Sequence, residues 1–421
     1  MKDKYIIIVD PYSSGALYAD ILKKNNIQPI AVLSSEKPPD VYSKSFIPND
    51  YAITYYFDSY SEIELIHLLR KFDPIAILTG CESGVKIAEL IAPKILPDRS
   101  NSAELAMSRW HKGEMNKAIT NANLPNMKQI CSNSITEIHE WIVFEKLQGK
   151  DLIIKPPASA STDSVTLVKN GVGWEAIFNK MIGVNNRLGR KNTSLMIQEF
   201  LTGKEYAVDV ITYAGKHSIC SICLYNKVQI NGVIGIYESM RWLSLDFKDC
   251  EIIINYATNV LDALGIMFGV SHIEIMMTDD GPKLIEIGAR PHGGGHPKYS
   301  KKAVGDSQIE RIVQSYINGE LSDKKYDLKC QMIVVFFICE NDCYIFGLQK
   351  LEKLKKLDSF FDMRVNIKEG DEVNATSDLF SSLDLGFVVL SHTDTEVIKN
   401  DYLIVRSLEK EIYVDKNFAR S

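Results

Sequence analysis

The chain has 421 residues, of which 45% are apolar and 24% are charged, and its formal net charge at pH 7 is −6. The length predicts roughly two to four domains, each able to bury its own core, in an ordinary globular protein. The negative charge, with lysines and arginines interspersed, argues against sequence-independent binding of nucleic acid. The apolar run before Asp10 is too short for a secretion signal and no window approaches a membrane span, so we predict a cytoplasmic protein without a membrane partner.

The first hundred residues alternate between apolar strands and amphipathic helices. Strands are expected at 5–10, 29–34 and 74–80, and helices at 15–24, at 61–72 and from Gly84 onward. Apolar strands separated by such helices predict an open parallel sheet covered on both faces. The loop after the first strand has a single glycine and lacks the dinucleotide-binding fingerprint, so we predict no nicotinamide or flavin site.

The rest of the chain begins with a helical segment and continues mainly as short strands. The pattern is helical from about 101 to 125, where Asn123 can adopt the left-handed cap and Pro125 stops the helix. Short alternating strands follow to about residue 320. A final run of short strands is expected to lead to the C-terminus.

The cysteines are spread along the chain without the density of a disulfide framework. Cys220 and Cys223 have the spacing of a zinc knuckle, but no second Cys or His pair follows at a zinc spacing. Because they lie in an apolar alternating run, we interpret them as buried strand residues.

Lys155 ends a predicted strand and opens a loop rich in small hydroxyl side chains. Pro156 and Pro157 cannot donate to a β-ladder, so the loop leaves the sheet and offers hydroxyls such as those of Ser161 and Thr162 beside the lysine. Small hydroxyl residues with backbone N–H groups suit phosphate oxygens. The alternative is an ordinary polar hairpin loop.

A second candidate segment runs from Gln198 to Glu205 and joins two predicted strands through Thr202 and Gly203. A strand that ends in this way presents backbone N–H and C=O groups that can pair with the edge of a purine. Glu205 is placed to accept hydrogen bonds from ribose hydroxyls. The alternative is a plain hairpin.

Residues 271–288 are typical of a β-hairpin with one carboxylate in each strand. Apolar and polar residues alternate around Glu274 and Glu286, as in half-buried strands. A three-residue loop, Asp279–Gly281, places glycine where left-handed backbone is least costly and sets Glu274 opposite Glu286. Two bare charges about 5 Å apart repel by about 3 kcal/mol at an effective dielectric of about 20, so a positive group is expected between them. The alternative is a solvated polar face.

Taken in order, these elements resemble the ATP-grasp ligases. The resemblance rests on Lys112, Lys155, the segment QEFLTGKE at 198–205, the pair Glu274 and Glu286, and Arg290. More narrowly, the stretches GCESGVKIAELIA, SRWHKGEM and EIGARPHGGG are similar to the L-amino-acid ligases, which make dipeptides and related amides. The resemblance covers nearly the whole chain.

The resemblance implies an α/β (α+β) architecture, the ATP-grasp fold, in three parts. These are an N-terminal pre-ATP-grasp domain with an open parallel sheet at 1–100, an ATP-grasp domain with two lobes at 101–325, and a small β-rich C-terminal domain at 326–421. The sequence departs from the family pattern at the phosphate loop, which has no glycine. It also departs at Gln198, which replaces a glutamate but can still accept from the adenine amino group.

The resemblance also implies roles for individual residues. The expected ATP-binding residues are Lys112, Lys155, Ser161, Gln198, Glu199, Leu201 and Glu205. Glu274 and Glu286 are the expected ligands of Mg²⁺, for which Mn²⁺ can substitute, and Arg290 is the expected catalytic residue. Substrate contacts are expected from Glu82, Glu238, Gly293, Gly294 and His296. Histidines in such a loop are more often structural or solvated, which is the alternative interpretation of His292 and His296.

The implied reaction is ATP-dependent ligation of a carboxylate to an amine. One substrate's carboxylate becomes an acyl phosphate, and the amine of a second substrate attacks it to give an amide, ADP and phosphate. Both substrates are expected to be small molecules, with amino acids favoured, and a homodimer is left open. Two other interpretations remain: an ATP-grasp carboxylase or formyl-phosphate transferase acting on a small metabolite, and a nucleotide-binding sensor without turnover.

Overall fold

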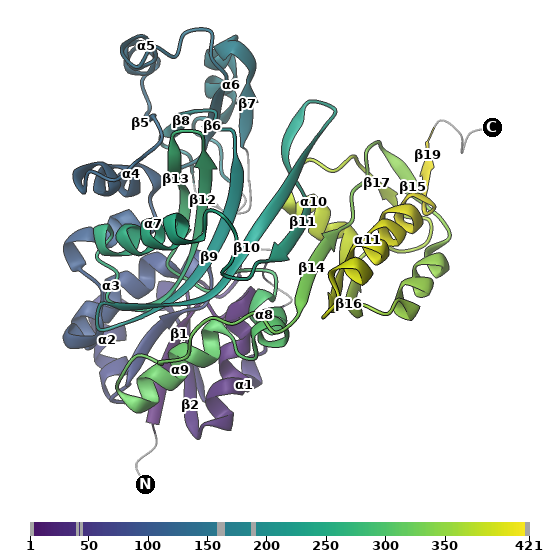
Figure 1. Cartoon of the computed structure of the whole chain (residues 1–421). Helices are drawn as coiled ribbons and strands as arrows, with labels where there is room; N and C mark the ends of the chain where they lie inside the picture. The colour runs from purple at the N-terminus through teal and green to yellow at the C-terminus, as the bar shows by residue number, and fades with distance from the viewer. Residues whose placement is uncertain (1–3, 39–41, 43–44, 158–164, 187–190, 417–421) are drawn as a thin grey trace.

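The computed structural model of the chain describes residues 4–38, 42, 45–157, 165–186 and 191–416. Its N-terminal part is an open sheet of parallel strands in the order β3-β2-β1-β4, which confirms the predicted sheet (Figure 1). The strands are β1 (Lys4–Val9), β2 (Ile27–Leu33), β3 (Ile53–Tyr56) and β4 (Ala76–Thr79).

Helices cover both faces of this sheet, as continuous apolar strands require. On one face lie α1 (Leu17–Lys24) and α9 (Gln308–Asn318), and on the other lie α2 (Glu62–Arg70) and α3 (Val85–Ile95). Because α9 comes from much later in the chain, the N-terminal sheet packs directly against the rest of the molecule.

The helical segment predicted at 101–125 forms in two pieces. A 3₁₀ helix at Ala103–Arg109 precedes α4 (Lys112–Asn121). Asn123 has a φ of 55°, which confirms the left-handed position expected before Pro125.

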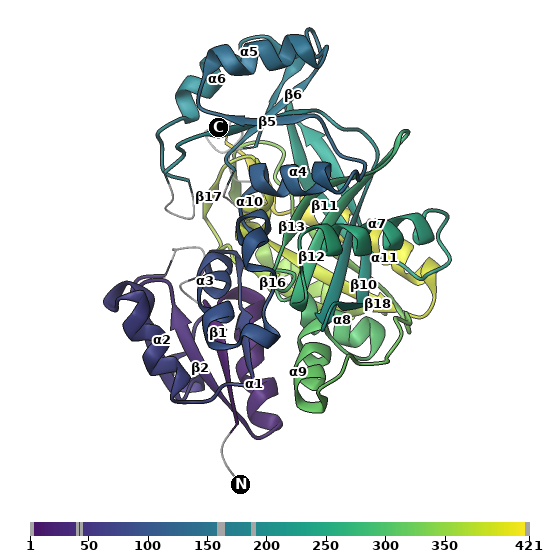
Figure 2. The same cartoon turned by 90° about the vertical axis from the view of Figure 1, so that its left-hand side faces the viewer.

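A four-stranded antiparallel sheet follows, in the order β5-β8-β6-β7. Its strands are β5 (Gln129–Ser132), β6 (Leu152–Lys155), β7 (Thr166–Val168) and β8 (Leu195–Glu199), and its helices are α5 (Ile135–Phe144) and α6 (Trp174–Met181). The helices pack on one face through a common apolar cluster. Figure 2 shows this unit as a separate lobe above the larger sheet.

An eight-stranded antiparallel sheet forms the body of the molecule, in the order β13-β12-β9-β10-β11-β14-β18-β16. The strands are β9 (Lys204–Tyr213), β10 (Lys216–Ile230), β11 (Val233–Trp242), β12 (Phe268–Thr278), β13 (Gly281–Gly288), β14 (Gln331–Phe336), β16 (Phe360–Val365) and β18 (Gly386–His392). Helix α7 (Cys250–Ala263) covers one face of β9, β12 and β13. Cys220 and Cys223 lie in β10 with exposures of 2% and 0%, which confirms them as buried strand residues.

The β12–β13 hairpin pairs Glu274 with Glu286, but it does so by a different route from the predicted one. Thr278 pairs with Gly281, so the turn has two residues and not three. A β-bulge at Ile285 then restores the opposition of the two glutamates. The bulge also places Ile285 at the cavity described below, whereas Ile287 remains in the core.

The last hundred residues are less β-rich than the sequence pattern indicated. Strands β14, β16 and β18 extend the large sheet, and β15 (Cys343–Ile345), β17 (Glu372–Val373) and β19 (Tyr413–Asp415) form a small one. Two helices were missed: α10 (Leu379–Leu385) and α11 (Thr395–Lys410). The amphipathic α11 buries Ile398 and Val405 against the outer face of β14 and β18. Among the described residues, no helix is both long and apolar enough to cross a membrane.

Candidate active site

A cavity of about 1710 Å³ opens where the two antiparallel sheets and the N-terminal part meet. The described candidates that line it are Glu82, Lys112, Lys155, Gln198, Glu199, Leu201, Glu205, Glu238, Glu274, Glu286, Arg290, Gly293, Gly294 and His296. Ser161 lies outside the described residues. Side chains separated by up to about 200 positions in the sequence therefore border one space.

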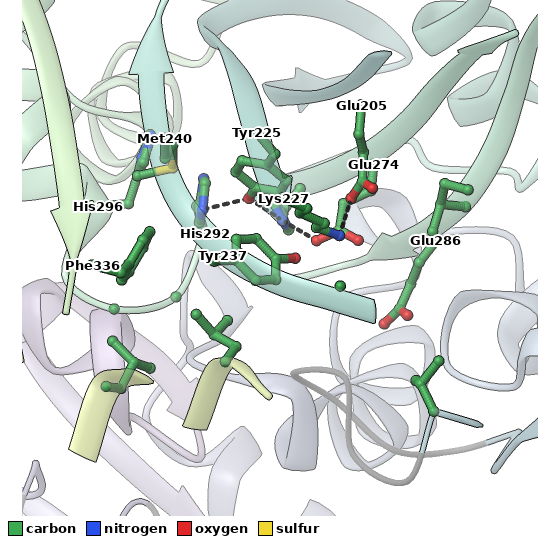
Figure 3. A pocket seen from close by; sticks show the side chains of 18 of the residues that line it. Glu205, Tyr225, Lys227, Tyr237, Met240, Glu274, Glu286, His292, His296 and Phe336 are labelled. Atoms are coloured by element: carbon green, nitrogen blue, oxygen red, sulfur yellow. Dashed lines mark hydrogen bonds and ion pairs between the residues drawn. The ribbon is translucent and has the colours of Figure 1, made fainter. Parts of the chain in front are cut away.

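The two candidate metal ligands reach this cavity from neighbouring strands. Glu274 and Glu286 are direct partners in the β12–β13 ladder, and their carboxylates lie on the same side of it (Figure 3). Lys112 Nζ is 3.2 Å from a carboxylate oxygen of Glu286 and supplies the positive group that the opposed charges require. Two converging carboxylates are the protein ligands that Mg²⁺ prefers when phosphate oxygens complete its shell, so these residues fit the ion.

Glu274 is kept ionised by its surroundings. Burial by itself raises the pKa of Glu274, but the hydrogen bond and positive charge of His272 and the charge of Lys227 outweigh burial and lower this pKa to about 2. The contact joins His272 Nε2 and Glu274 Oε1 at 3.3 Å. A carboxylate that remains charged in a buried site is suited to a divalent cation.

Lys112 and Lys155 reach the cavity from two different elements, α4 and β6. Lys112 is the first residue of α4, where its backbone N–H donates to the carbonyl of Pro157 at 3.0 Å, and Lys155 is the last residue of β6. Their exposures are 8% and 7%. Burial, and then the charge of Lys112, lower the pKa of Lys155 to about 8. An anionic ligand between these lysines would favour the charged form of Lys155 and so offset the lowering of its pKa.

The end of β8 and the residues that follow it were expected to contact adenine. The Gln198 side-chain NH₂ group donates to the amide oxygen of Gln129. The amide oxygen of Gln198 is the atom of this side chain that can accept a hydrogen bond. The Glu199 carboxylate accepts from Lys283 Nζ at 3.1 Å and from the backbone N–H of Lys128 at 2.9 Å. The Glu199 side chain is therefore used inside the protein.

Lys227 is a site residue that the sequence interpretation missed. Its Nζ lies 2.6 Å from Glu205 Oε1 and 4.3 Å from the centroid of the Tyr237 ring (Figure 3). Burial by itself lowers the pKa of Lys227, but Glu205 and Tyr237 outweigh burial and raise it, so the side chain is cationic. Lys227 lies near the end of the long strand β10. The alternation of residues along that strand could have predicted on which face of the sheet the Lys227 side chain lies.

Arg290 joins the N-terminal part to the loop that follows β13. Its Nε donates to a carboxylate oxygen of Glu82 at 3.0 Å, between residues 208 positions apart. The following glycines are held in the same way, because the N–H groups of Gly294 and Gly295 donate to Ser13 Oγ and Ser14 Oγ at 3.3 and 3.0 Å. The loop is thus fixed from the N-terminal side.

A buried carboxylate fixes this loop from the other side. Asp209 of β9 is 1% exposed and accepts from His272 Nδ1 at 2.8 Å, His292 Nδ1 at 3.1 Å and Ser221 Oγ at 2.5 Å. His296 Nδ1 lies 3.3 Å from the same carboxylate. The sequence interpretation missed this cluster, although Asp209 and His272 are direct partners in the β9–β12 ladder. His296, expected to contact substrate, is thereby used largely as a structural residue.

The histidine cluster is arranged for hydrogen bonding and not for coordination. Potential ligand atoms of Asp209, His292 and His296 lie within 4.8 Å of one another. The His292 and His296 rings, however, are stacked at 3.7 Å with 12° between their planes, so their lone pairs lie in two parallel planes that no single ion can share. Burial and then His272 lower the pKa of His292 to about 4, which keeps this ring neutral. Asp209 and His272 form the charged pair of the cluster.

Glu238 is the one candidate whose carboxylate points elsewhere. A β-bulge between β10 and β11 leaves Glu238 unpaired in the ladder and keeps Tyr237 and Met240 on the cavity face. The Glu238 side chain forms a hydrogen bond with Tyr402 of α11 on the other side of the sheet. We therefore do not retain Glu238 as a contact for a substrate ammonium group.

The four-stranded and eight-stranded antiparallel sheets enclose opposed carboxylates and buried lysines. This arrangement is an ATP-grasp architecture. The chain contains an ATP-grasp domain, because residues 148–297 match the sequence model of that domain. This match contains Lys155, Glu205, Glu274, Glu286 and Arg290, whereas Lys112 precedes it.

The chain is similar to a synthase in sequence and to a ligase and a synthetase in structure. Dapdiamide A synthase of Enterobacter agglomerans is 26% identical over 358 residues, which are 83% of this chain and 82% of that protein. The L-amino acid ligase from Bacillus licheniformis superposes with a TM-score of 0.73 over 99% of both chains at 16% identity. N5-carboxyaminoimidazole ribonucleotide synthetase from Thermotoga maritima gives 0.66 over 98% of this chain and 99% of that chain at 17% identity. The structural similarities show a shared fold.

Proposed function

We propose that the protein is an ATP-dependent ligase that joins the carboxylate of one amino acid to the amine of another through an acyl phosphate, releasing ADP and phosphate. The observation that carries the proposal is the opposition of Glu274 and Glu286 in the same cavity as Lys112, Lys155 and Arg290. The similarity to dapdiamide A synthase supports an amide-forming reaction over other ATP-grasp chemistry.

ATP would lie between the four-stranded sheet and the large sheet. Gln198 and the backbone of Glu199 and Leu201 would contact adenine, and Glu205 would accept from the ribose hydroxyls. Lys112 and Lys155 would hold the phosphates, whose negative charge compensates two buried cations. Ser161 is proposed for the same role on sequence grounds alone.

Mg²⁺ would be held by Glu274 and Glu286, and it would neutralise the phosphate charge that otherwise repels an attacking carboxylate. Arg290 presents a planar guanidinium to the same space, where it can hold the transferred phosphoryl group and the oxyanion that forms when the amine attacks. Catalysis of this kind depends on positioning and charge, so it requires no covalent nucleophile from the protein.

Glu82 contributes by fixing the orientation of Arg290. Its carboxylate accepts from Nε, which leaves the two terminal NH₂ groups of the guanidinium to donate to other groups. One of them donates to the carbonyl of Pro291 at 3.1 Å. Glu82 is therefore proposed first as a positioning residue and second as a contact for a substrate ammonium group.

The direct test is a phosphate-release screen of the purified chain with Mg²⁺, ATP and all pairs of proteinogenic amino acids, with mass spectrometry of the products. We expect ADP and an amide whose mass is the sum of two amino acids less one water. Release that depends on bicarbonate or formate would assign a carboxylase or formyl-phosphate transferase instead. ATP binding without release under any condition would indicate a sensor.

A further inference from the structure

The cavity extends beyond the proposed reaction centre into a region walled by apolar side chains. In Figure 3, Met240 and Phe336 lie at one side of the cavity, and Glu205, Glu274 and Glu286 lie at the other. We call this region the apolar end. It is lined by Met240, Tyr299, Phe336, Leu379, Leu383 and Phe387.

An unbroken series of aromatic rings leads from the reaction centre to the apolar end. Tyr225, whose hydroxyl is 3.0 Å from His292 Nε2, lies 5.0 Å from Tyr237, measured between ring centroids. Tyr237 lies 6.0 Å from Phe336, and Phe336 lies 6.2 Å from Phe387. Contacts of this length are ordinary edge-to-face aromatic packing, so the wall is continuous.

The strand pairing explains why this wall is apolar. Met240 is opposite Val334 in the β11–β14 ladder, and Phe336 is opposite Phe387 in the β14–β18 ladder, so all four side chains lie on the inner face of the sheet. The residues that alternate with them along β14 and β18 instead face α11; these are Ile333, Val335, Val388 and Leu390. Alternation along the strands thus gives the cavity an apolar surface and the far face a separate core.

Helix α10 closes the apolar end. Leu379 and Leu383 are four positions apart, so both point to one side of the helix, and both are half-buried against the aromatic wall. Arg364 and Asp384, two charged residues that border this region, are exposed, and the guanidinium of Arg364 lies 5.4 Å from the centroid of the Phe387 ring. A charged group placed among the apolar side chains and away from Arg364 would have to give up its hydration without a partner.

We infer that the apolar end binds the side chain of one amino-acid substrate and selects for a large apolar residue. Leu379 and Leu383 are the proposed specificity-determining residues. They lie outside the matched ATP-grasp domain, so the selection would belong to the C-terminal segment of this chain and not to the shared catalytic body. This inference rests on the proposed amino-acid ligase function.

The first test uses the unchanged protein and a series of amino acids that differ by single methylene groups. Alanine, aminobutyrate, norvaline and norleucine are each paired with the best partner from the screen, and kcat/KM is measured by phosphate release. Burial of each methylene is expected to raise kcat/KM by about fourfold until the region is filled. Fragmentation of the product by mass spectrometry shows whether the apolar residue supplied the carboxylate or the amine.

The second test places a charge in the apolar end. Leu383→Glu is expected to lower kcat/KM for norleucine at least tenfold and to leave the reaction of alanine within about twofold. Leu403→Glu is the matched control, because Leu403 lies on α11 and is 64% exposed. It should change neither value. Thermal melting of both variants establishes that they are folded.

The outcomes distinguish failure of the proposed side-chain selectivity from failure of the proposed ligase function. A flat methylene series, or a faster reaction with charged side chains than with norleucine, would overturn the inference and leave the ligase function intact. An unchanged norleucine preference in folded Leu383→Glu would do the same. Absence of phosphate release with every amino-acid pair would overturn the ligase function, and the inference with it.

Discussion

Glu82 and Arg290 form an ion pair at 3.0 Å across the boundary between the N-terminal part and the ATP-grasp body. Both side chains are largely buried, with exposures of 9% and 15%. Burial by itself lowers the pKa of Arg290, but Glu82, Tyr42 and Glu286 together outweigh burial and raise it, so the guanidinium is permanently charged. The pair therefore fixes a cation in the cavity and ties its position to the neighbouring domain.

Arg290→Lys is expected to keep ATP affinity and to lose turnover. ATP binding would rest on Lys112, Lys155 and the hinge after β8, whereas Arg290 would act on charge that develops during the reaction. Removal of one such donor typically costs on the order of 10²-fold or more in rate. Calorimetry of ATP binding beside product formation measures both effects. Arg99→Lys, at an exposed site, is the control, and parental rates in the Arg290 variant would remove its catalytic role.

Glu286→Gln is expected to abolish phosphate release without unfolding the protein, since it removes a charge from a site where two carboxylates already oppose each other. Glu274→Gln should behave similarly. In the parent, Mg²⁺ and ATP together should raise the melting temperature by more than the sum of their separate effects. That excess should vanish in both variants and persist in Glu104→Gln, an exposed control. An excess retained in both variants would refute the metal assignment.

ATP affinity is expected to weaken as pH rises above 8. The pKa of Lys155 is lowered to about 8 in the folded protein by burial and then by Lys112. Above this pH the side chain is neutral and its attraction for phosphate is lost, by up to about tenfold in dissociation constant between pH 8 and pH 9. Lys155→Arg remains charged, so calorimetry should show a flatter pH profile for this variant. Identical profiles would contradict the placement of Lys155 at the phosphates.

The same pKa predicts the sign of a stability effect. Between pH 8 and the ordinary lysine pKa, the unfolded chain binds more protons at residue 155 than the folded chain does. The contribution of Lys155 to the free energy of unfolding therefore rises with pH in this interval. Urea denaturation of the parent and of Lys155→Met at pH 7.5 and pH 9.5 isolates it, because the methionine variant lacks the titrating group. A parental contribution that falls with pH would contradict the assigned shift.

Asp209→Asn is expected to lower the free energy of unfolding by about 3 kcal/mol, because it leaves buried histidine donors without an anionic acceptor. Asp262→Asn is the matched control, since Asp262 also contacts a histidine, His217, but is 69% exposed. Its effect should stay within about 0.5 kcal/mol. Urea denaturation at pH 7 measures both. Equal, small effects would show that the cluster does not hold the glycine loop in place.

The sequence predicted the candidate site correctly where the periodicity of one strand determines which way a side chain points. Alternation along the two strands was sufficient to place Glu274 and Glu286 on one side of the hairpin, although the turn was assigned one residue too many. The error was hidden because the bulge at Ile285 compensates for it. A bulge depends on how two strands fit together, and no single-strand pattern reports it.

Residues fixed by long-range pairing were the ones missed. Lys227 meets Glu205 because the β9–β10 ladder ends at the pair of Tyr225 with Glu205, two positions before Lys227. Asp209 meets three histidines that come from two other segments. Their sequence neighbours give no sign of these contacts. Similarly, α11 lies in the region where the sequence predicted only short strands, whereas packing against β14 and β18 favours the helix.

The pairing of β11 with β14 also bears on how the chain is made. Residues 239–241 have no neighbour on their free side until residues 333–335 have left the ribosome, so β11 is an unprotected edge during that interval. Vectorial synthesis would therefore complete the catalytic body before the wall formed by β14, β18 and α10 exists. The nascent protein would pass through a stage with a nucleotide site but an open apolar surface, the stage at which a chaperone would have the most to bind.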